Sequence, residues 1–393
     1  MTEVSDDERL ARAALTGLSE PGNVILARFV AEHGPEATLQ AIRNGSYPGT
    51  ALQDLQARLA ASEPGADLDR AAKAGAWLVC PGDPEWPVQL DVLAESESTE
   101  GAGGEPLALW VRGSLELGVI TQRACAIVGA RSATQYGTHV AGELAAGLAD
   151  RGVTIVSGGA FGIDVAAHRG ALAANGYTVA VLACGVDIPY PRAHAALFDR
   201  IAEEGLLVSE VPPGSTPRRP RFLVRNRLIA ALSEGTVVVE AALRSGALNT
   251  AAWAHRCQRE VMAIPGSVLS PLSAGTNQLI RDAGAILVTD SAEIAEQIGR
   301  IGDDLAPVKA GEQRARDALD RRSQQVLECV PVQQFQGIAQ LAATAGVPVD
   351  ETLAVLGHLL LLGFVEHVGA GWRLSAAERT RNRHASTVER TGS

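Results

Sequence analysis

The spacing of apolar residues changes along the chain and divides it into three parts. In residues 1–75, apolar positions recur at the spacing of amphipathic helices, and two breaks rich in glycine and proline interrupt them. This pattern predicts a small helical domain of the SAM or helix-hairpin type, with helices over residues 18–30 and 36–42.

Residues 124–290 repeat one pattern, in which an apolar run is followed by a glycine turn and an amphipathic helix. Continuous apolar strands are typical of a parallel sheet that is buried on both faces. Alternation with helices predicts a doubly wound α/β sheet, which binds ligands beyond the carboxyl ends of its strands. With the extended pieces that begin near residue 77, this domain is predicted over residues 76–295. The predicted strands are residues 125–128, 154–156, 178–182, 206–208, 237–239, 261–264 and 285–288.

The last part has a different pattern. Residues 296–322 are charged, contain glycine and proline, and are predicted as a linker. Residues 323–375 predict three helices followed by a short hairpin, which is typical of a winged helix. The predicted helices are residues 323–330, 338–345 and 350–362. Residues 376–393 are predicted as a disordered tail, and the acidic loop 95–105 as mobile.

Composition narrows the class of protein. A bilayer-spanning helix needs about 18 apolar residues in a row, and the sequence has no such run. The acidic N-terminus lacks the features of a signal peptide. The five cysteines are scattered without any Cys-x-x-Cys pair, and the histidines lack metal-ligand spacing. We therefore expect a cytoplasmic protein without a membrane partner, a metal or a cofactor.

The segment 154–172 contains the strongest motif for chemistry. An apolar strand ends at Ser157, turns through Gly158 and Gly159, and is followed by a helix that begins near Gly162. Glycines allow a ligand to approach the backbone closely, and a helix N-terminus attracts anions. The sequence therefore predicts a phosphate-binding crevice. The alternative for Ser157 is a hydroxyl that bonds local backbone.

The end of the first parallel strand offers a second phosphate contact. Gly129 permits a tight turn, and Arg131 can present a planar guanidinium to a phosphate. The alternative is that Arg131 caps the sheet edge or pairs with a surface acid. The pattern is not Gly-x-Gly-x-x-Gly, and no acid follows the second strand to bind ribose. These departures argue against a dinucleotide-dependent dehydrogenase.

Asp164 and His168 lie four residues apart on one helix and could form half of a catalytic arrangement. No nucleophile elbow or second carboxylate near this motif completes such a site. We favour structural, orienting roles for both residues.

An arginine-rich segment precedes the fifth predicted strand. It holds five arginines and one aromatic ring within ten residues, and no acid lies among them: Arg218, Arg219, Arg221, Phe222, Arg225 and Arg227. Such a segment favours electrostatic binding of a polyanion, with Phe222 stacking on a base, in spite of the net charge of −11.

Further glycine loops follow the next strands, at Ser245-Gly246 and from Gly266 to Asn277. Successive loops of this kind predict an extended phosphate-lined site. No Walker lysine motif is present, so the sequence gives no support to ATP hydrolysis.

Together these motifs resemble one family, the DNA-processing protein A family (DprA, also called Smf). The resemblance covers roughly residues 75–290 and follows the family's order. Its motifs are Gly129-Ala-Arg131 with Tyr136-Gly, Ser157-Gly-Gly-Ala-Phe-Gly-Ile-Asp164 with His168, Arg225-Asn-Arg-Leu-Ile-Ala-Ala-Leu-Ser, Ser245-Gly-Ala-Leu-Asn-Thr-Ala, and Pro265-Gly-Ser with Gly275-Thr-Asn277-Gln-Leu-Ile.

The resemblance implies an extended Rossmann-like domain in a homodimer that is not an enzyme. It implies binding of single-stranded DNA, which is protected and delivered to the RecA recombinase during natural transformation. By the resemblance, the DNA pocket is lined by Gly129, Arg131, Ser157, Gly158, Arg225, Asn226 and Arg227. The chain departs from the family at Leu223-Val224, where an aromatic–proline pair is common, and in the inserted loop 95–105.

Two alternatives remain open. A nucleotide-binding enzyme or sensor of the lysine-decarboxylase-like phosphoribohydrolase group would share the doubly wound sheet, but it resembles Pro-Gly-Gly-x-Gly-Thr where this chain has Ser245-Gly-Ala-Leu-Asn-Thr. A transcription factor would use the winged helix, yet residues 350–362 contain no Arg or Lys for phosphate contacts.

Overall fold

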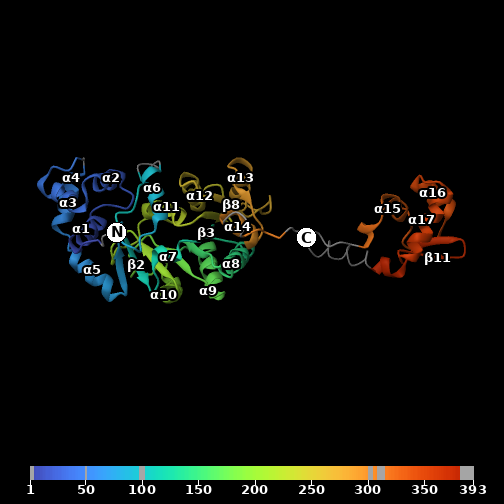
Figure 1. Cartoon of the computed structure of the whole chain (residues 1–393), viewed down its shortest axis with the longest axis horizontal. Coiled ribbons are helices and arrows are strands. Elements are labelled where there is room, and N and C mark those ends of the chain that lie inside the picture. The colour runs from blue at the N-terminus through green and yellow to red at the C-terminus, as the bar shows by residue number, and fades with distance from the viewer. Residues whose placement is uncertain (1–3, 49–50, 97–101, 300–303, 308–314, 381–393) are drawn as a thin grey trace. The chain divides into compact units, whose positions relative to one another are not determined.

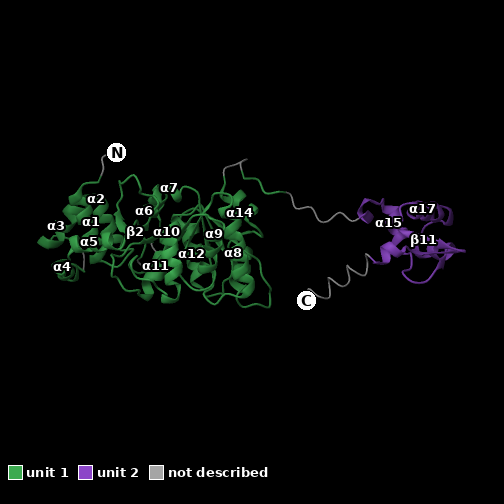
Figure 2. Ribbon diagram, turned by 90° about the horizontal axis from the view of Figure 1, so that it is seen from below, with its two compact units in different colours: residues 1–307 green, residues 308–393 purple. Residues whose placement is uncertain are grey.

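The computed structural model describes residues 4–48, 51–96, 102–299, 304–307 and 315–380. It divides the chain into two compact units, residues 1–307 and 308–393 (Figures 1 and 2). Among the described residues, no helix combines the length and the apolar composition that crossing a bilayer requires.

The larger unit begins with five helices: α1 (Asp6–Leu18), α2 (Val24–His33), α3 (Pro35–Asn44), α4 (Leu52–Ala60) and α5 (Pro64–Lys73). The prediction of one helix over residues 18–30 is wrong. The chain turns after α1 through Gly22, whose φ is 78°. Asn23 then caps α2, because its side chain accepts a hydrogen bond from the Leu26 amide at 3.1 Å. The predicted helix 36–42 lies within α3.

A nine-stranded sheet forms the centre of this unit, in the order β1-β2-β6-β5-β4-β3-β7-β8-β9. The strands from β3 to β9 pair in parallel, whereas β2 pairs antiparallel with both β1 and β6. Each apolar run predicted as a strand overlaps one strand from β3 to β9. The strands are β1 (Ala76–Val79), β2 (Leu109–Gly113), β3 (Ala124–Val128), β4 (Thr154–Ser157), β5 (Thr178–Val181), β6 (Leu206–Ser209), β7 (Gly235–Val238), β8 (Glu260–Ala263) and β9 (Ile286–Leu287).

Helices cover both faces of the sheet, so the predicted doubly wound α/β fold is confirmed (Figure 1). On one face lie α8 (Gln135–Ala149), α9 (Ile163–Ala173), α10 (Ala195–Glu204) and α14 (Ser291–Ile298). On the other lie α11 (Arg219–Ala231) and α12 (Gly246–Arg256). Shorter elements are η1 (Val88–Asp91), α6 (Val92–Glu95), α7 (Leu117–Ile120), η2 (Arg192–His194) and α13 (Ala274–Asp282).

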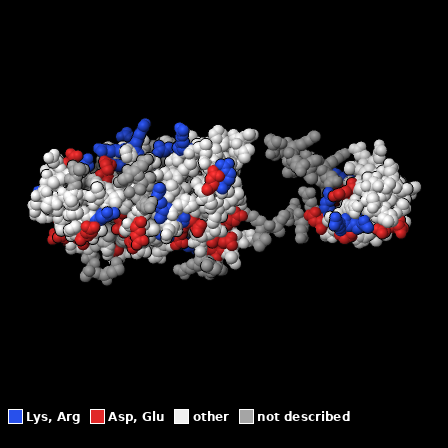
Figure 3. All heavy atoms as spheres, turned by 90° about the horizontal axis from the view of Figure 1, so that it is seen from above, with Lys and Arg blue, Asp and Glu red and all other residues white. Residues whose placement is uncertain are grey.

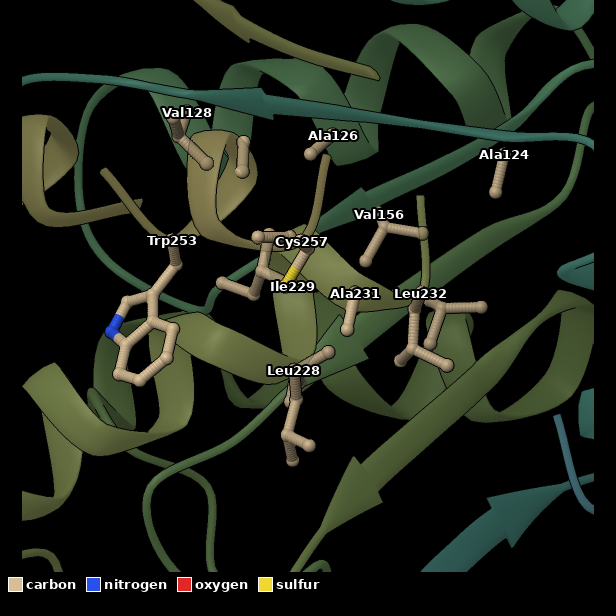
Figure 4. Packing of buried hydrophobic residues seen from close by; sticks show 14 of the residues in the cluster. Ala124, Ala126, Val128, Val156, Leu228, Ile229, Ala231, Leu232, Trp253 and Cys257 are labelled. Carbon is tan, nitrogen blue, oxygen red and sulfur yellow. The ribbon is translucent and has the colours of Figure 1, made fainter. Parts of the chain in front are cut away.

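The core beneath α11 and α12 fixes both helices on the sheet. Leu228 of α11 is 0% exposed and Trp253 of α12 is 2% exposed, and both belong to one buried cluster with Val128 and Val156 of the strands (Figure 4). Full burial of a large apolar side chain stabilises a fold by about 1.5–3 kcal/mol. The polar residues of α11 are therefore held in place by its own apolar face.

The strand order places a topological switch point at β3, because β4 follows on one side and β7 on the other. The chain segments that leave the carboxyl ends of β3 and β7 diverge at this point. Doubly wound sheets bind their ligands in the crevice that opens there.

The smaller unit contains η3 (Ala315–Ala318), α15 (Arg321–Glu328), β10 (Gln336–Gly337), α16 (Ile338–Ala345), α17 (Val349–Leu361), β11 (Val365–Val368) and β12 (Gly371–Leu374). Three helices and a hairpin match the predicted winged-helix pattern. Strand β10 adds a third strand to the hairpin, in the order β10-β12-β11.

Three expected boundaries differ from the structure. Helix α14 continues to Ile298, whose side chain is 5% exposed, and α15 begins at Arg321, so the predicted linker 296–322 is too long at both ends. The predicted disordered tail begins too early, because residues 376–380 are helical and Arg379 forms an ion pair with Glu366 at 3.0 Å. The rest of that tail, and residues 97–101 of the acidic loop, lie outside the described residues.

Candidate nucleic-acid interface

A crevice of about 360 Å³ opens at the switch point. Its walls come from the segment after β3, the elbow before α9, one side of α11, and the segment from β7 to α12. The predicted site residues that line it are Gly129, Arg131, Phe222, Arg225, Asn226, Ser245 and Gly246, together with Asp164.

Two helix N-termini, those of α9 and α12, open on this crevice. Gly162 precedes α9 with a φ of 80°, and a Cβ there would lie 2.2 Å from the Ala130 carbonyl oxygen. The side chain of Ser245 caps α12 by accepting a hydrogen bond from the Ala247 amide at 3.3 Å. Free backbone amides and helix dipoles at these ends favour an anion in the crevice.

Arg131 stands exposed at the mouth of the crevice. Its guanidinium carbon lies 5.1 Å from the centre of the Phe222 ring, an arrangement that suits a cation–π contact. Among the described residues, no acidic side chain forms an ion pair with Arg131. The arrangement thus leaves its guanidinium available to a phosphate.

Arg225 and Asp164 form the charged floor of the crevice. The Arg225 guanidinium donates to the Val181 carbonyl and, at 3.3 Å, to the side-chain oxygen of Asn226. Burial lowers the pKa of Arg225 to about 10, and burial raises the pKa of Asp164 to about 6 against the opposing charge of Arg225. At pH 7 the floor therefore holds a charged guanidinium beside a carboxyl group that is mostly ionised and gains a proton as the pH falls through about 6.

Gly158 leaves room for both of these side chains. A Cβ on Gly158 would lie 2.5 Å from an Asp164 carboxylate oxygen and 2.6 Å from an Arg225 nitrogen. Gly158 and Ser157 are themselves buried, and the Ser157 hydroxyl donates to the Ile127 carbonyl at 2.6 Å. Both residues thus lie behind the crevice rather than on its surface, which corrects their predicted contact with DNA.

His168 connects α9 to the elbow and to β5. Its Nε2 lies 2.6 Å from the Gly158 carbonyl oxygen, which can only accept, so we assign the ring hydrogen to Nε2. Its Nδ1 lies 2.7 Å from the Thr178 hydroxyl. Burial lowers the pKa of His168 to about 4, so the ring is neutral at pH 7. The Thr178 hydroxyl also donates to the Ile155 carbonyl at 2.8 Å. These contacts support an orienting role.

Asp164 and His168 should make opposite contributions to the pH dependence of stability. Unfolded histidine keeps its proton up to about pH 6.5 and folded His168 only up to about pH 4, so this group stabilises the fold increasingly as pH rises between those values. Asp164 keeps its proton up to about pH 6 in the folded protein but only up to about pH 3.8 in the unfolded chain. Its contribution to the stability of the fold therefore decreases as pH rises between 3.8 and 6. Because the two contributions oppose each other, this pair should change the stability of the wild-type protein little over this pH range.

In Asp164→Asn, the free energy of unfolding relative to wild type should therefore rise by about 2–3 kcal/mol between pH 4 and 6.5. For His168→Gln, the free energy of unfolding relative to wild type should instead fall over the same pH range. Urea unfolding at three pH values measures both differences. A difference that does not change with pH in either variant would contradict the assigned protonation states.

Arg227 does not belong to the crevice, which corrects its predicted contact with DNA. Its side chain is completely buried and pairs with Glu210 through two contacts of 2.5 and 2.6 Å. Its Nε also donates to the Gly104 carbonyl at 2.9 Å. Arg227 therefore anchors the end of the loop that precedes β2 to α11.

No acid lies within the arginine segment in the sequence, but the fold brings one to it. Glu20, from the turn between α1 and α2, pairs with Arg221 at 2.6 Å and with Arg218 at 3.0 Å. The hydrogen bond from Arg221 lowers the pKa of Glu20, so the carboxylate is charged at neutral pH. Arg219 lies exposed at the start of α11.

Three further predicted site residues, Asn277, Gly266 and Gly159, do not line the main crevice. The Asn277 side chain exchanges two hydrogen bonds with the Gly266 backbone, at 3.2 and 3.1 Å, and so closes its own loop. Gly159 lines a neighbouring hollow. Asn226 reaches the crevice, where its amide donates to the Gly246 carbonyl at 3.3 Å and to the Asn249 side chain at 3.2 Å.

The surface charge is distributed unevenly. In Figure 3, Lys and Arg side chains of the larger unit are concentrated along the upper edge, and most Asp and Glu side chains lie along the lower edge. Local charge governs the attraction of a polyanion, so a net charge of −11 is compatible with such a ligand. Among the described residues, no cluster of histidine, cysteine and acidic side chains could hold a metal ion.

Sequence reasoning missed two exposed aromatic side chains near the crevice. Phe161 lies within the glycine elbow and is 48% exposed, and Tyr190 follows β5 and is 44% exposed. Phe161 lies inside a motif whose glycines and acid, but not its aromatic ring, predict a ligand site. Tyr190 stands in a Pro-Tyr-Pro sequence that no pattern connected to the site.

Comparison with known proteins shows similarity to one family and to its solved structures. Residues 77–299 match the family model for DNA recombination-mediator protein A. A Mycobacterium tuberculosis relative that carries the DprA name is 44% identical over 375 residues, which cover 95% of this chain and 96% of the relative. Protein Smf of Escherichia coli is 39% identical over 73% of this chain and 74% of its own length. The solved DNA processing protein A of Streptococcus pneumoniae matches with a TM-score of 0.62 and 30% identity, over 76% of this chain and all of that structure.

Proposed function

The chain belongs to the DNA recombination-mediator protein A family, and from this premise we propose that its crevice binds single-stranded DNA. In this proposal the protein is not an enzyme. It protects incoming single strands in the cytoplasm, acts as a homodimer, and loads the RecA recombinase onto the strand during transformation and recombination.

The crevice itself carries the proposal. Arg131, Arg225 and the N-termini of α9 and α12 surround one space with positive charge, and Phe222 stands at its rim. Such a combination suits a phosphate backbone together with an unstacked base. A duplex keeps its bases paired and stacked, and so cannot offer one to Phe222.

The geometry gives less support to the alternative of a nucleotide-cleaving enzyme. Among the described residues that line the crevice, Asp164 is the one carboxylic acid, and its Oδ2 accepts a hydrogen bond from the Ala160 amide at 3.3 Å. An acid and a separate base or nucleophile would both be needed for glycosidic hydrolysis.

The smaller unit fits a protein-contact role better than DNA recognition. The first turn of helix α17 contains Asp350 and Glu351, and the helix surface includes Leu353 at 53% exposure and Leu361 at 86%. Acidic and apolar side chains disfavour phosphate contacts and favour packing against another protein. We therefore propose that this unit is an interaction or regulatory module.

A titration of oligothymidine and of a duplex of equal length, at 50 and 200 mM salt, tests the proposal. If about three phosphates are neutralised, single-strand affinity should fall about 20-fold between the two salt concentrations. The duplex should bind more weakly at both. Equal binding of the two, or no binding of the single strand, would exclude this function.

Glu20 should restrain DNA binding, because it neutralises Arg218 and Arg221 at the edge of the arginine segment. Replacing it with glutamine should raise single-strand affinity about two- to five-fold at low salt, as expected for partly exposed ion pairs. The affinity of this variant should also fall more steeply with salt than that of wild type. Glu32→Gln removes the same charge from an exposed position on α2 and should leave affinity unchanged. Identical titrations for both variants would show that Glu20 does not compete with DNA.

A further inference from the structure

One buried acid, Glu240, holds both ends of the turn that carries Arg131. Glu240 follows β7 and is 2% exposed. At the start of the turn, its backbone carbonyl accepts a hydrogen bond from the Ala130 amide at 2.7 Å. At the end of the turn, its carboxylate accepts from the Thr134 amide at 2.8 Å and from the Thr134 hydroxyl at 2.5 Å. The exposed Arg131 therefore stands on a turn that is fixed on both sides.

The carboxylate of Glu240 lies at the N-terminus of α8. Thr134 caps this helix, because its hydroxyl oxygen accepts a hydrogen bond from the Gly137 amide at 3.0 Å. A Cβ on Gly137 would lie 2.2 Å from the Oε2 of Glu240, so a side chain at this position would displace the carboxylate. A helix N-terminus attracts an anion. At α8 the protein supplies that anion itself.

This position is one that other doubly wound sheets give to a ligand. When such a sheet binds a dinucleotide, the pyrophosphate lies at the helix N-terminus that follows the first strand of the unit. Here β3 is the first parallel strand along the chain and α8 follows it. Glu240 occupies the end of α8, so a phosphate near this turn must be bound by the exposed side chain of Arg131 and not by the amides of α8.

From these contacts we propose that Glu240 is a positioning residue for DNA binding, whose buried carboxylate fixes the turn that presents Arg131 to a phosphate. The inference rests on the proposed function. A loose turn would have to be ordered when the strand binds, and ordering a side chain and its backbone weakens binding. A turn that Glu240 has already fixed avoids that loss.

The sign of one substitution separates this role from plain electrostatics. A negative charge near the crevice repels phosphate, so its removal by itself should raise DNA affinity. Glu240→Gln removes the charge but also places an amide NH₂ group, which cannot accept a hydrogen bond, beside Thr134. If Glu240 positions Arg131, the affinity for an oligothymidine of about 15 nucleotides should instead fall about five-fold.

Two further proteins show whether the effect passes through Arg131. In an Arg131→Ala background, Glu240→Gln should cause no further loss of affinity, because the side chain that it positions is already absent. Glu143→Gln removes the same charge from an exposed position on α8 and should leave the affinity of wild type unchanged. Fluorescence anisotropy at low salt measures all of these affinities, and urea unfolding of each variant shows that it is folded.

A pair of substitutions at Thr134 tests the same contact and leaves the carboxylate in place. Thr134→Val removes the hydroxyl that donates to Glu240, and should weaken oligothymidine binding about two- to five-fold. Thr134→Ser keeps the hydroxyl and should bind as wild type does. This pair decides the question if Glu240→Gln does not fold.

The outcomes distinguish the positioning role from the proposed function. If wild type binds oligothymidine, and Glu240→Gln and Thr134→Val bind it as tightly or more tightly, the positioning role is wrong and the crevice function stands. If Glu240→Gln causes the same loss with and without Arg131, its effect does not pass through that arginine and the positioning role is again wrong. If wild type does not bind oligothymidine, the proposed function fails and the positioning role with it.

Discussion

Arg227→Ala should destabilise the larger unit by about 3–5 kcal/mol, because it leaves the carboxylate of Glu210 buried without its partner. The two side chains are 0% and 8% exposed. Water therefore cannot replace the lost contacts. The Gly104 carbonyl would lose its donor as well. A loss of this size is a large part of the stability of an ordinary domain.

Urea unfolding followed by tryptophan fluorescence measures this loss. Of the five tryptophans, Trp77, Trp86, Trp110 and Trp253 lie in residues 1–307, so the signal reports mainly on the larger unit. The double variant Arg227→Met with Glu210→Leu removes both charges and should recover much of the stability. An alanine variant that unfolds within about 1 kcal/mol of wild type would contradict the buried ion pair.

The same variant separates two roles for Arg227. A direct DNA contact, as the family resemblance implies, predicts lost affinity with an intact fold. An anchor predicts lost stability, with single-strand affinity close to wild type under conditions where the variant remains folded. The complete burial of the side chain favours the anchor.

Periodicity in the sequence was sufficient to locate the strands of the larger sheet. Continuous apolar runs such as those around Val128 and Val156 belong to strands buried on both faces, where the pattern is strong. The order of the strands could not be obtained in this way. The pairing of β3 with β7, which opens the crevice, joins residues more than 100 positions apart.

The site was predicted less completely, for reasons of geometry. Residues two apart on a helix point in different directions, so Arg225 and Arg227 cannot both face the crevice from α11. That correction was available from helical spacing. Helical spacing could not reveal the pairing of Arg221 with Glu20, because 201 positions separate the two residues. Only the packing of the helical segment onto the sheet brings them together.

Arg131→Ala should weaken single-strand binding at least about 10-fold at low salt without harm to the fold. The guanidinium is exposed and free of ion pairs among the described residues, so its loss leaves no buried partner unsatisfied. A charge-assisted hydrogen bond to phosphate contributes about 1.5–3 kcal/mol. The variant also loses the cation that lies over Phe222. The salt dependence should become shallower by about 0.7 in its logarithmic slope if one phosphate contact is lost.

The most direct measurement of the central claim is therefore the affinity of wild type, Arg131→Ala and Arg151→Ala for oligothymidine, by fluorescence anisotropy at two salt concentrations. Arg151 is an exposed arginine before the amino end of β4, on the opposite edge of the sheet, and provides a matched loss of charge. A crevice that binds single strands predicts a large loss for Arg131→Ala and almost none for Arg151→Ala. Equal affinities for all three proteins would contradict it.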